Sequence, residues 1–234
     1  MPQIRLISWP PCTYLVLGRV EFIELPEGPR NMANTTKTND ISKADEILEV
    51  GQELIQTVGY DGFSYRDIAD RVGIKSASVH YYFPAKTDLA EAVAEQYRTE
   101  FAETVREISA NTTGALERLE EFAGIFQDTL ENLDRVCLCG MLASESSSVP
   151  DTVSAQTRLF FNEQQDWIGQ TIADGIDAGT IIATLEPDEF AKTFLSALEG
   201  AMMMARSMEQ PEHLASVSKQ MISLLRPVTT TAAV

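Results

Sequence analysis

The segment from Ser64 to Leu89 limits the possible folds most strongly, because it predicts two short helices separated by a tight turn. Ser64 and Asp67 have the spacing of a capping box, in which the serine hydroxyl accepts a hydrogen bond from a free amide. The first helix should therefore begin near Tyr65. Gly73 should end it, since glycine adopts the left-handed conformation of a helix C-terminus without steric cost.

The second helix of the pair should begin at Lys75 or Ser76 and end before Pro84, which cannot continue a regular helix. Val79 and Phe83 are four residues apart, so we expect both to face the core. The remaining positions carry hydroxyls, an imidazole and two phenols in place of the Glu and Lys of an ordinary exposed helix. They are Ser76, Ser78, His80, Tyr81 and Tyr82.

Such short donors suit phosphates and base edges, so the pattern favours a helix-turn-helix whose second helix enters the DNA major groove. The alternative is an ordinary helical hairpin, which a glycine turn alone would also permit. After Pro84 a third helix is expected, with Thr87 as its cap and Asp88 in its first turn. A further helix, from about Ser42 to Val58, should precede the pair.

The net charge of −17 argues against DNA binding, since proteins that hold phosphate backbones usually have a basic surface. The charge is unevenly distributed, however. From Arg71 through Thr87 the chain carries Arg71, Lys75 and Lys86 and no acidic residue. We therefore expect specific contacts, repeated in a dimer, to supply the affinity in place of long-range attraction.

The same residues resemble the TetR family of transcriptional regulators. The family pattern has a serine or threonine cap, a D-I-A core, a G-V/I turn, an aromatic recognition helix ending in Phe, and a lysine that starts the next helix. Here these are Ser64, Asp67-Ile68-Ala69, Gly73-Ile74, His80-Tyr81-Tyr82-Phe83 and Lys86, within residues 41–97. The chain departs from the pattern at Lys75, where serine is frequent, and at His80, where tyrosine is frequent.

The resemblance implies a cytoplasmic homodimer, expected to repress transcription at a palindromic double-stranded DNA operator and to release it when a small-molecule effector binds. Phosphate contacts are expected from Ser64 and Lys86, and contacts to base edges or sugars from Ser78, His80 and Tyr82. The full set of expected DNA contacts is Ser64, Lys75, Ser76, Ser78, His80, Tyr81, Tyr82 and Lys86. No cofactor, metal or membrane partner is expected, and no apolar run is long enough to span a bilayer.

The rest of the chain has helical periodicity without a strand pattern, so the predicted fold is all-α: a three-helix DNA-binding domain joined to a larger helical domain. Helices are expected at 88–109, 115–133, 136–143, 151–178 and 188–208, and again after Pro211. The expected domains are 40–97 for DNA binding and 98–228 for ligand binding and dimerisation, with a short tail at 229–234. Residues 1–39 are expected to be a disordered or non-native extension.

The N-terminal 30 residues mix apolar pieces with four prolines and lack the uninterrupted apolar run of a signal peptide. We therefore interpret Met32 as the natural start, a hypothesis that the intact mass of the native protein would test.

In TetR-family proteins the second domain encloses a ligand cavity, and its last two helices form the dimer interface. By resemblance, the lining residues expected here are Phe122, Phe126, Cys139, Met141, Phe160 and Trp167. This apolar, aromatic and sulfur-containing set suits an apolar or amphipathic effector. The expected dimer residues are Phe194, Leu198, Met202, Leu214, Val217 and Met221, although helical spacing alone allows the same side chains to close the core of one subunit.

Three cysteines and two histidines leave few options for other chemistry. Cys12 has no evident partner, and Cys137 and Cys139 point to opposite sides of a helix, which disfavours a shared metal or a disulfide. They are either small buried apolar residues or a sensor for electrophiles and oxidants. A helical ligand-binding protein without DNA binding is another alternative. An enzyme is weaker, because no acid–base or nucleophile cluster is visible and His213 is expected in an exposed position.

Overall fold

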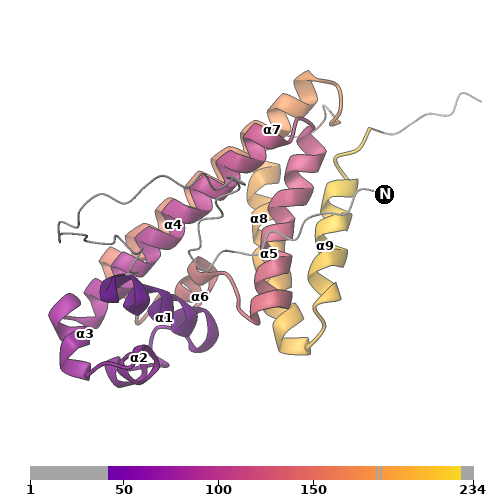
Figure 1. Ribbon diagram of the computed structural model, residues 1–234. Coiled ribbons are helices and arrows are strands. Elements are labelled where there is room, and N and C mark those ends of the chain that lie inside the picture. The colour runs from indigo at the N-terminus through magenta and orange to yellow at the C-terminus, as the bar shows by residue number, and fades with distance from the viewer. Residues whose placement is uncertain (1–41, 183, 185, 228–234) are drawn as a thin grey trace, which may run out of the picture. The chain divides into compact units, whose positions relative to one another are not determined.

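The computed structural model describes residues 42–182, 184 and 186–227, which form nine helices and no strand. The predicted 1–39 extension, Cys12, Met32 and the 229–234 tail lie outside these residues. Within them, no helix has the length and apolar character needed to cross a membrane. In chain order the helices are α1 Lys43–Val58, α2 Tyr65–Val72, α3 Ser76–Tyr82, α4 Lys86–Asn111, α5 Ala115–Leu133, α6 Leu138–Ser144, α7 Asp151–Asp177, α8 Pro187–Met208 and α9 Glu212–Ser223 (Figure 1).

The first three helices form a small domain around an apolar centre. Ser42 caps α1 as predicted, since its hydroxyl accepts from the Asp45 amide and the Asp45 carboxylate accepts from the Ser42 amide. Ile47 on α1, Ile68 on α2 and Val79 on α3 have no exposed surface. These helices therefore meet through buried aliphatic side chains, and α1 also packs against α4.

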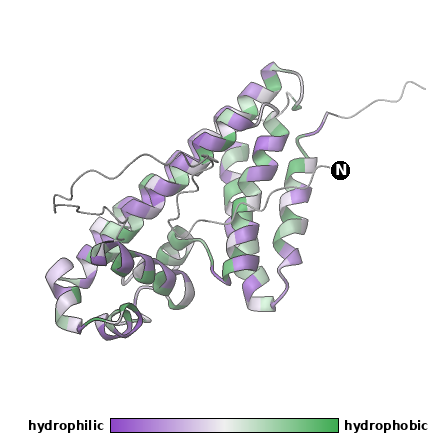
Figure 2. Ribbon diagram, viewed as in Figure 1, coloured by the Kyte–Doolittle hydropathy of each residue, from purple (hydrophilic) through white to green (hydrophobic). Residues whose placement is uncertain are grey.

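The larger domain consists of α4 to α9. Helix α4 runs alongside α7, while α5, α8 and α9 lie beside one another (Figure 1). Hydrophilic and hydrophobic residues alternate along α4, α5 and α9, as expected for helices with one buried side (Figure 2). Four fully buried aromatic residues fill the space between α4, α5 and α7: Phe101, Phe122, Phe126 and Phe160.

Two of the differences from the predicted helix boundaries change the role of a residue. Thr87 does not cap α4, because the helix already begins at Lys86 and the Asp88 carboxylate accepts a hydrogen bond from the Ala85 amide (2.9 Å). Helix α6 begins at Leu138 and not at residue 136, which makes Cys137 its N-cap. Helix α4 also continues across the predicted domain boundary at 97/98, so both domains share one continuous helix.

Candidate nucleic-acid interface

Helices α2 and α3 form the helix-turn-helix that the sequence predicts. Ser64 and Asp67 pair at the start of α2 as predicted, and the Asp67 carboxylate accepts from both the amide and the hydroxyl of Ser64 at 2.7 Å. The hydroxyl thus donates to Asp67, whereas the predicted capping box had it accepting from an amide. The hydrogen bond from the Ser64 hydroxyl is the main cause that lowers the pKa of Asp67. The start of α2 is thus fixed by a charged cap.

Gly73 ends α2 in the left-handed conformation, with φ 73° and ψ 34°. Its amide and that of Ile74 both donate to the Ala69 carbonyl oxygen, which completes the end of the helix. Three residues later α3 begins, and Val79 anchors it with no exposed surface. Phe83, the other residue expected in the core, is only half-buried.

The outer side of α3 carries the polar and aromatic residues predicted to contact DNA. Tyr81 is 82% exposed and Tyr82 41% exposed, and their rings meet edge to face with centroids 5.3 Å apart. Lys75 and His80 are also exposed, while Ser76 and Ser78 are half-buried. Large phenols left in water at the surface are suited to a partner that covers them.

A hollow of about 420 Å³ lies between the start of α2, helix α3 and the start of α4. It brings together four of the eight predicted DNA contacts, from three different helix ends. It also includes Arg66, which is not among the predicted DNA contacts, although a positive charge two residues after the Ser64 cap could have indicated a phosphate contact. The lining residues are Phe63, Ser64, Tyr65, Arg66, Ser76, His80 and Lys86.

Tyr65 organises this hollow, although no sequence pattern beyond its place at the start of α2 singled it out. Its hydroxyl donates to the carbonyl oxygens of Phe83 (2.9 Å) and Ala85 (2.6 Å), which ties α2 to the turn between α3 and α4. Burial raises the pKa of Tyr65 to about 12, so the phenol keeps its proton at neutral pH. The His80 ring packs on the Tyr65 ring at a centroid distance of 4.6 Å.

Lys86 has structural contacts in addition to its predicted phosphate contact. Its ammonium donates to the Phe63 carbonyl oxygen and lies 4.1 Å from the Phe63 ring centroid and 5.0 Å from that of Tyr60. This partial burial lowers the pKa of Lys86. Lys86 therefore joins the start of α4 to the turn before α2, and only its remaining donors are available to a phosphate.

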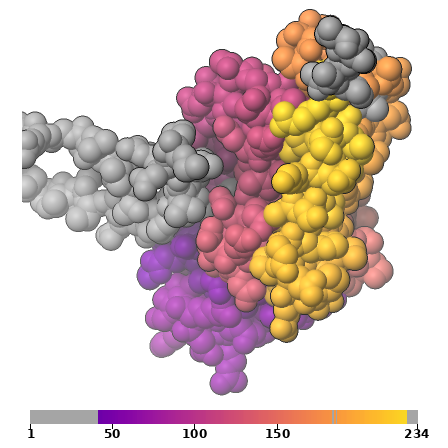
Figure 3. Space-filling view, turned by 90° about the vertical axis from the view of Figure 1, so that its right-hand side faces the viewer, coloured from indigo at the N-terminus to yellow at the C-terminus, as the bar shows by residue number. Residues whose placement is uncertain are grey.

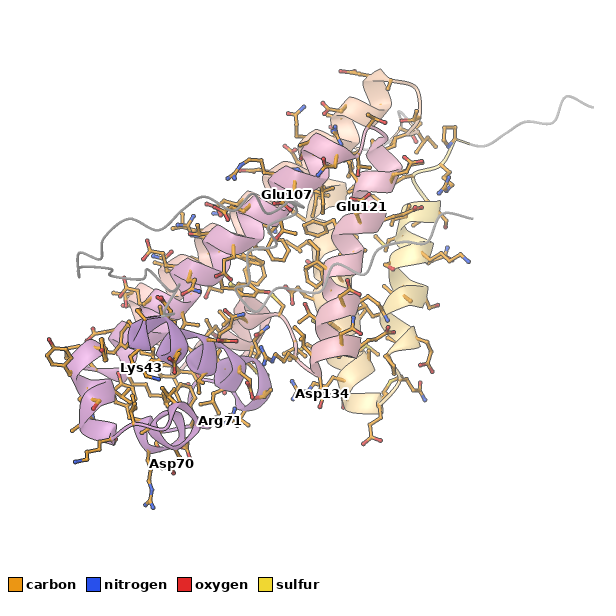
Figure 4. All side chains as sticks on the ribbon, in the orientation of Figure 1. Lys43, Asp70, Arg71, Glu107, Glu121 and Asp134 are labelled. Carbon is orange, nitrogen blue, oxygen red and sulfur yellow. The ribbon has the colours of Figure 1, made fainter. Side chains whose placement is uncertain are left out.

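Polar contacts connect the helix-turn-helix to the larger domain. Arg71, near the end of α2 (Figure 4), pairs with Glu53 of α1 at 2.5 Å. The other oxygen of Glu53 pairs with Arg135, between α5 and α6, at 3.0 Å. Gln56 of α1 donates to the Val136 carbonyl oxygen at 2.9 Å. Arg71 is thus held by the protein. Arg66 also pairs with Asp70 of the same helix at 3.9 Å, so Lys75, which has no ion pair among the described residues, carries the positive charge most available to DNA.

Arg206 of α8 makes a further connection to α1. Its two terminal nitrogens donate to the carbonyl oxygens of Gln56 (2.9 Å) and Thr57 (3.0 Å) in the last turn of α1. That turn has no basic residue of its own, so Arg206 supplies the cation that a helix C-terminus favours.

Replacing Arg206 by alanine should lower the free energy of unfolding by about 1.5–3 kcal/mol, because two hydrogen bonds to a charged donor are lost. Urea denaturation would measure this loss. Arg158→Ala removes an exposed arginine that has no ion pair among the described residues and serves as the control. Equal stability of the two variants would contradict the role of Arg206.

The residues predicted to line an effector cavity mostly fill the core. Phe122, Phe126, Phe160 and Cys139 are at most 2% exposed, and Met141 is half-buried. Trp167 is half-buried at the edge of a surface groove between α4 and α7. The predicted set therefore does not surround one open cavity in this conformation.

Cys137 and Cys139 are free thiols and both are buried. Burial raises the pKa of each thiol well above its usual range. Because the thiolate is the reactive form, this burial disfavours the predicted alternative of an electrophile or redox sensor. The two thiols match the other prediction, which was small buried apolar residues.

Four of the six predicted dimer residues are buried within the single chain. They are at most 1% exposed: Phe194, Leu198, Met202 and Leu214. They are buried because α8 and α9 pack against each other and against α5, and α8 also packs against α7. For these four, the core alternative that helical spacing left open fits the structure. Val217 and Met221 are half-buried. Apolar side chains that do remain exposed on or beside these helices are Met203, Met204, Met208 and Leu224.

Comparison with known proteins agrees with this architecture. The family described as bacterial regulatory proteins, tetR family, matches residues 47–93, and the tetracyclin repressor-like C-terminal domain matches residues 115–221. The transcriptional regulator AcuR of Cereibacter sphaeroides is 26% identical over 83% of this chain and 90% of its own length. The HTH-type transcriptional repressor DhaR of a Mycobacterium species is 23% identical over 78% of this chain and 92% of its own length.

A solved structure extends the match to three dimensions. A TetR-family transcriptional regulator from Agrobacterium tumefaciens superposes with a TM-score of 0.77 at 32% identity. The match covers 79% of this chain and 98% of the other. With the helix-turn-helix geometry, these similarities establish that the chain belongs to the TetR family of transcriptional regulators.

Proposed function

We propose that this protein is a homodimeric repressor that binds a palindromic operator and releases it when a small apolar or amphipathic effector binds its larger domain. The observation that carries the proposal is the exposed polar and aromatic side of α3, set beyond a left-handed glycine turn. The name of DhaR, which describes a repressor, supports repression over activation. A protein that acts on chromosomal DNA would work in the cytoplasm.

The dimer in this proposal pairs the exposed apolar residues of α8 and α9. Met204 is 51% and Leu224 55% exposed, and Met203 and Met208 add further apolar surface on α8. Helix α9 lies open along one face of the molecule (Figure 3). Exposed methionines pack adaptably, which suits a helix-to-helix interface. A two-fold dimer would present two copies of α3 to two half-sites about one DNA turn apart.

Gel shifts on the DNA upstream of the protein's own gene test this function. Lys75→Ala should weaken binding to every sequence similarly and reduce the slope of log affinity against log salt by about 2 per dimer, because each subunit loses one phosphate contact. His80→Ala should instead change the preference among operator variants, because base contacts carry sequence information.

Arg158→Ala removes the same charge from α7, away from the helix-turn-helix, and should leave the salt slope unchanged. If Lys75→Ala and His80→Ala both bound the operator as the unmodified protein does, the assignment of α3 as the recognition helix would be wrong.

A further inference from the structure

A groove of about 280 Å³ runs between α4 and α7 in the larger domain. Its size suits a molecule with a single ring. Residues from one side of each helix line it. They include Val105, Arg106 and Ser109 of α4 and Glu163, Gln164 and Trp167 of α7.

Two hydrogen-bond acceptors in this lining lack donors. Gln164 is 2% exposed, and its side-chain oxygen has no hydrogen-bond partner among the described residues. The same holds for one carboxylate oxygen of Glu163, whose other oxygen pairs with Arg98 at 2.6 Å. Buried acceptors without donors are costly and uncommon in native proteins. Both residues line the groove, and the terminal torsions of their side chains are soft.

The charges around the groove exclude two classes of ligand. The Arg98–Glu163 pair is neutral overall, so Arg106, which is exposed without an ion pair in the described structure, gives the residues that line the groove a net positive charge. A cationic ligand would be repelled by this charge. A carboxylate ligand would face the free oxygens of Glu163 and Gln164, which are acceptors like its own. A neutral ligand that donates hydrogen bonds fits both conditions.

The apolar side of the groove is held rigidly. The Trp167 indole donates to the Ser109 hydroxyl at 2.8 Å and stacks on Phe122, with centroids 5.3 Å apart and an interplanar angle of 20°. Val105 adds a buried aliphatic surface beside it. A fixed aromatic surface of this kind favours a flat ring.

We propose that this groove binds a small neutral ring compound with hydroxyl groups, such as a phenol or a ring diol. Its hydroxyls donate to Gln164 and Glu163, and its ring lies against Trp167. This inference rests on the proposed function, for which it supplies the effector class. The groove lies on α4, the helix that begins at Lys86 in the DNA-facing hollow. A ligand bound near one end of α4 can therefore change the position of the helix-turn-helix at the other end, provided that it binds one arrangement of this helix more tightly than another.

The emission of Trp167 tests this site directly. The chain has two tryptophans, so a Trp9→Phe background leaves Trp167 as the single tryptophan reporter. Catechol, a neutral ring with two hydroxyls, should change this emission saturably with a dissociation constant below about 1 mM. Benzoate and benzylamine, which have one ring and opposite charges, should bind at least about tenfold more weakly.

Gln164→Leu keeps the size of the side chain and removes the acceptor, so it should weaken catechol binding about tenfold. Gln164→Met provides a second variant of similar length. Gln165→Leu changes the neighbouring glutamine, which does not line the groove, and should bind catechol normally. Circular dichroism would verify that each variant is folded.

Absence of saturable catechol binding, or unchanged binding by both Gln164 variants, would overturn the proposal and leave ordered water as the partner of these oxygens. Gel shifts without catechol keep the two proposals distinguishable, because they test operator binding independently of the groove. If the protein formed no operator complex in the absence of catechol but still bound catechol, the proposed function would be wrong and the site would stand.

Discussion

Replacing Phe101 by alanine should lower the free energy of unfolding by about 3–5 kcal/mol. Phe101 is 1% exposed and lies at the centre of the aromatic core of the larger domain. Its ring centroid is 5.0 Å from that of Phe160, 5.8 Å from Phe122 and 6.2 Å from Phe126. Three large partners fixed by one another cannot easily close the resulting cavity, so both the transfer and the cavity costs should be observed.

Urea denaturation followed by circular dichroism would measure the loss. Leu159→Ala is the matched control, because Leu159 is 46% exposed on α7, and its removal should change the free energy of unfolding by about 0.5 kcal/mol or less. A Phe101→Ala loss as small as that of the control would show that the aromatic core repacks. Because α4 also reaches the helix-turn-helix, we expect operator affinity to fall together with stability.

Much of the fold could be predicted because local patterns determine it. Helix α5 has the predicted bounds, Ala115–Leu133, since a polar loop precedes it and its apolar residues recur at helical spacing. The Ser64–Asp67 pair at the start of α2 and the glycine end at Gly73 depend on neighbours within one turn. Each of these features depends on residues that are close together in the sequence, so the local pattern is enough to predict it.

The connections between distant segments could not be predicted in this way. Arg206 reaches α1 across about 150 positions, and Glu53 links Arg71 with Arg135. Helical periodicity says which side of a helix is buried but not which partner it meets. The contacts of Tyr65 and Lys86 could not be predicted for the same reason, because the turns around Phe63 and Phe83 place the carbonyl oxygens that they bind.

The predicted dimer residues also show that helical periodicity does not identify the partner of an apolar stripe. Phe194, Leu198 and Met202 recur at helical spacing, as an interface would require, yet they are buried in their own chain. Helix α8 is covered by α7, α9 and α5, so its most regular apolar stripe belongs to the core. The less regular exposed residues, such as Met204 and Met208, are the ones left for a second subunit.

A second large effect is expected at Glu199 of α8, whose carboxyl group is buried beside the thiols of Cys137 and Cys139. One of its oxygens has no hydrogen-bond partner in the described part of the chain. Burial raises the pKa of Glu199 from 4.5 to about 7. The folded protein therefore binds this proton more tightly than the unfolded chain does.

The sign of the pH dependence follows from that difference. The stabilisation is fully present below about pH 4.5 and is lost as the pH rises through about 7, because the folded state binds the additional proton between these values. Glu199→Gln keeps a polar side chain of similar size but cannot titrate. Relative to this variant, the unmodified protein should lose on the order of 3 kcal/mol of stability between about pH 4.5 and pH 8.

Urea denaturation of both proteins at three pH values across this range would measure the difference. Glu103→Gln, at an exposed position of α4, should follow the pH dependence of the unmodified protein. A Glu199→Gln difference that stayed constant with pH would mean that the carboxyl is solvated in solution. A difference that grows with pH would show that deprotonation of Glu199 destabilises the folded protein. Because Arg206 on the same helix holds the last turn of α1, operator affinity should weaken over the same pH range, and less so in Glu199→Gln.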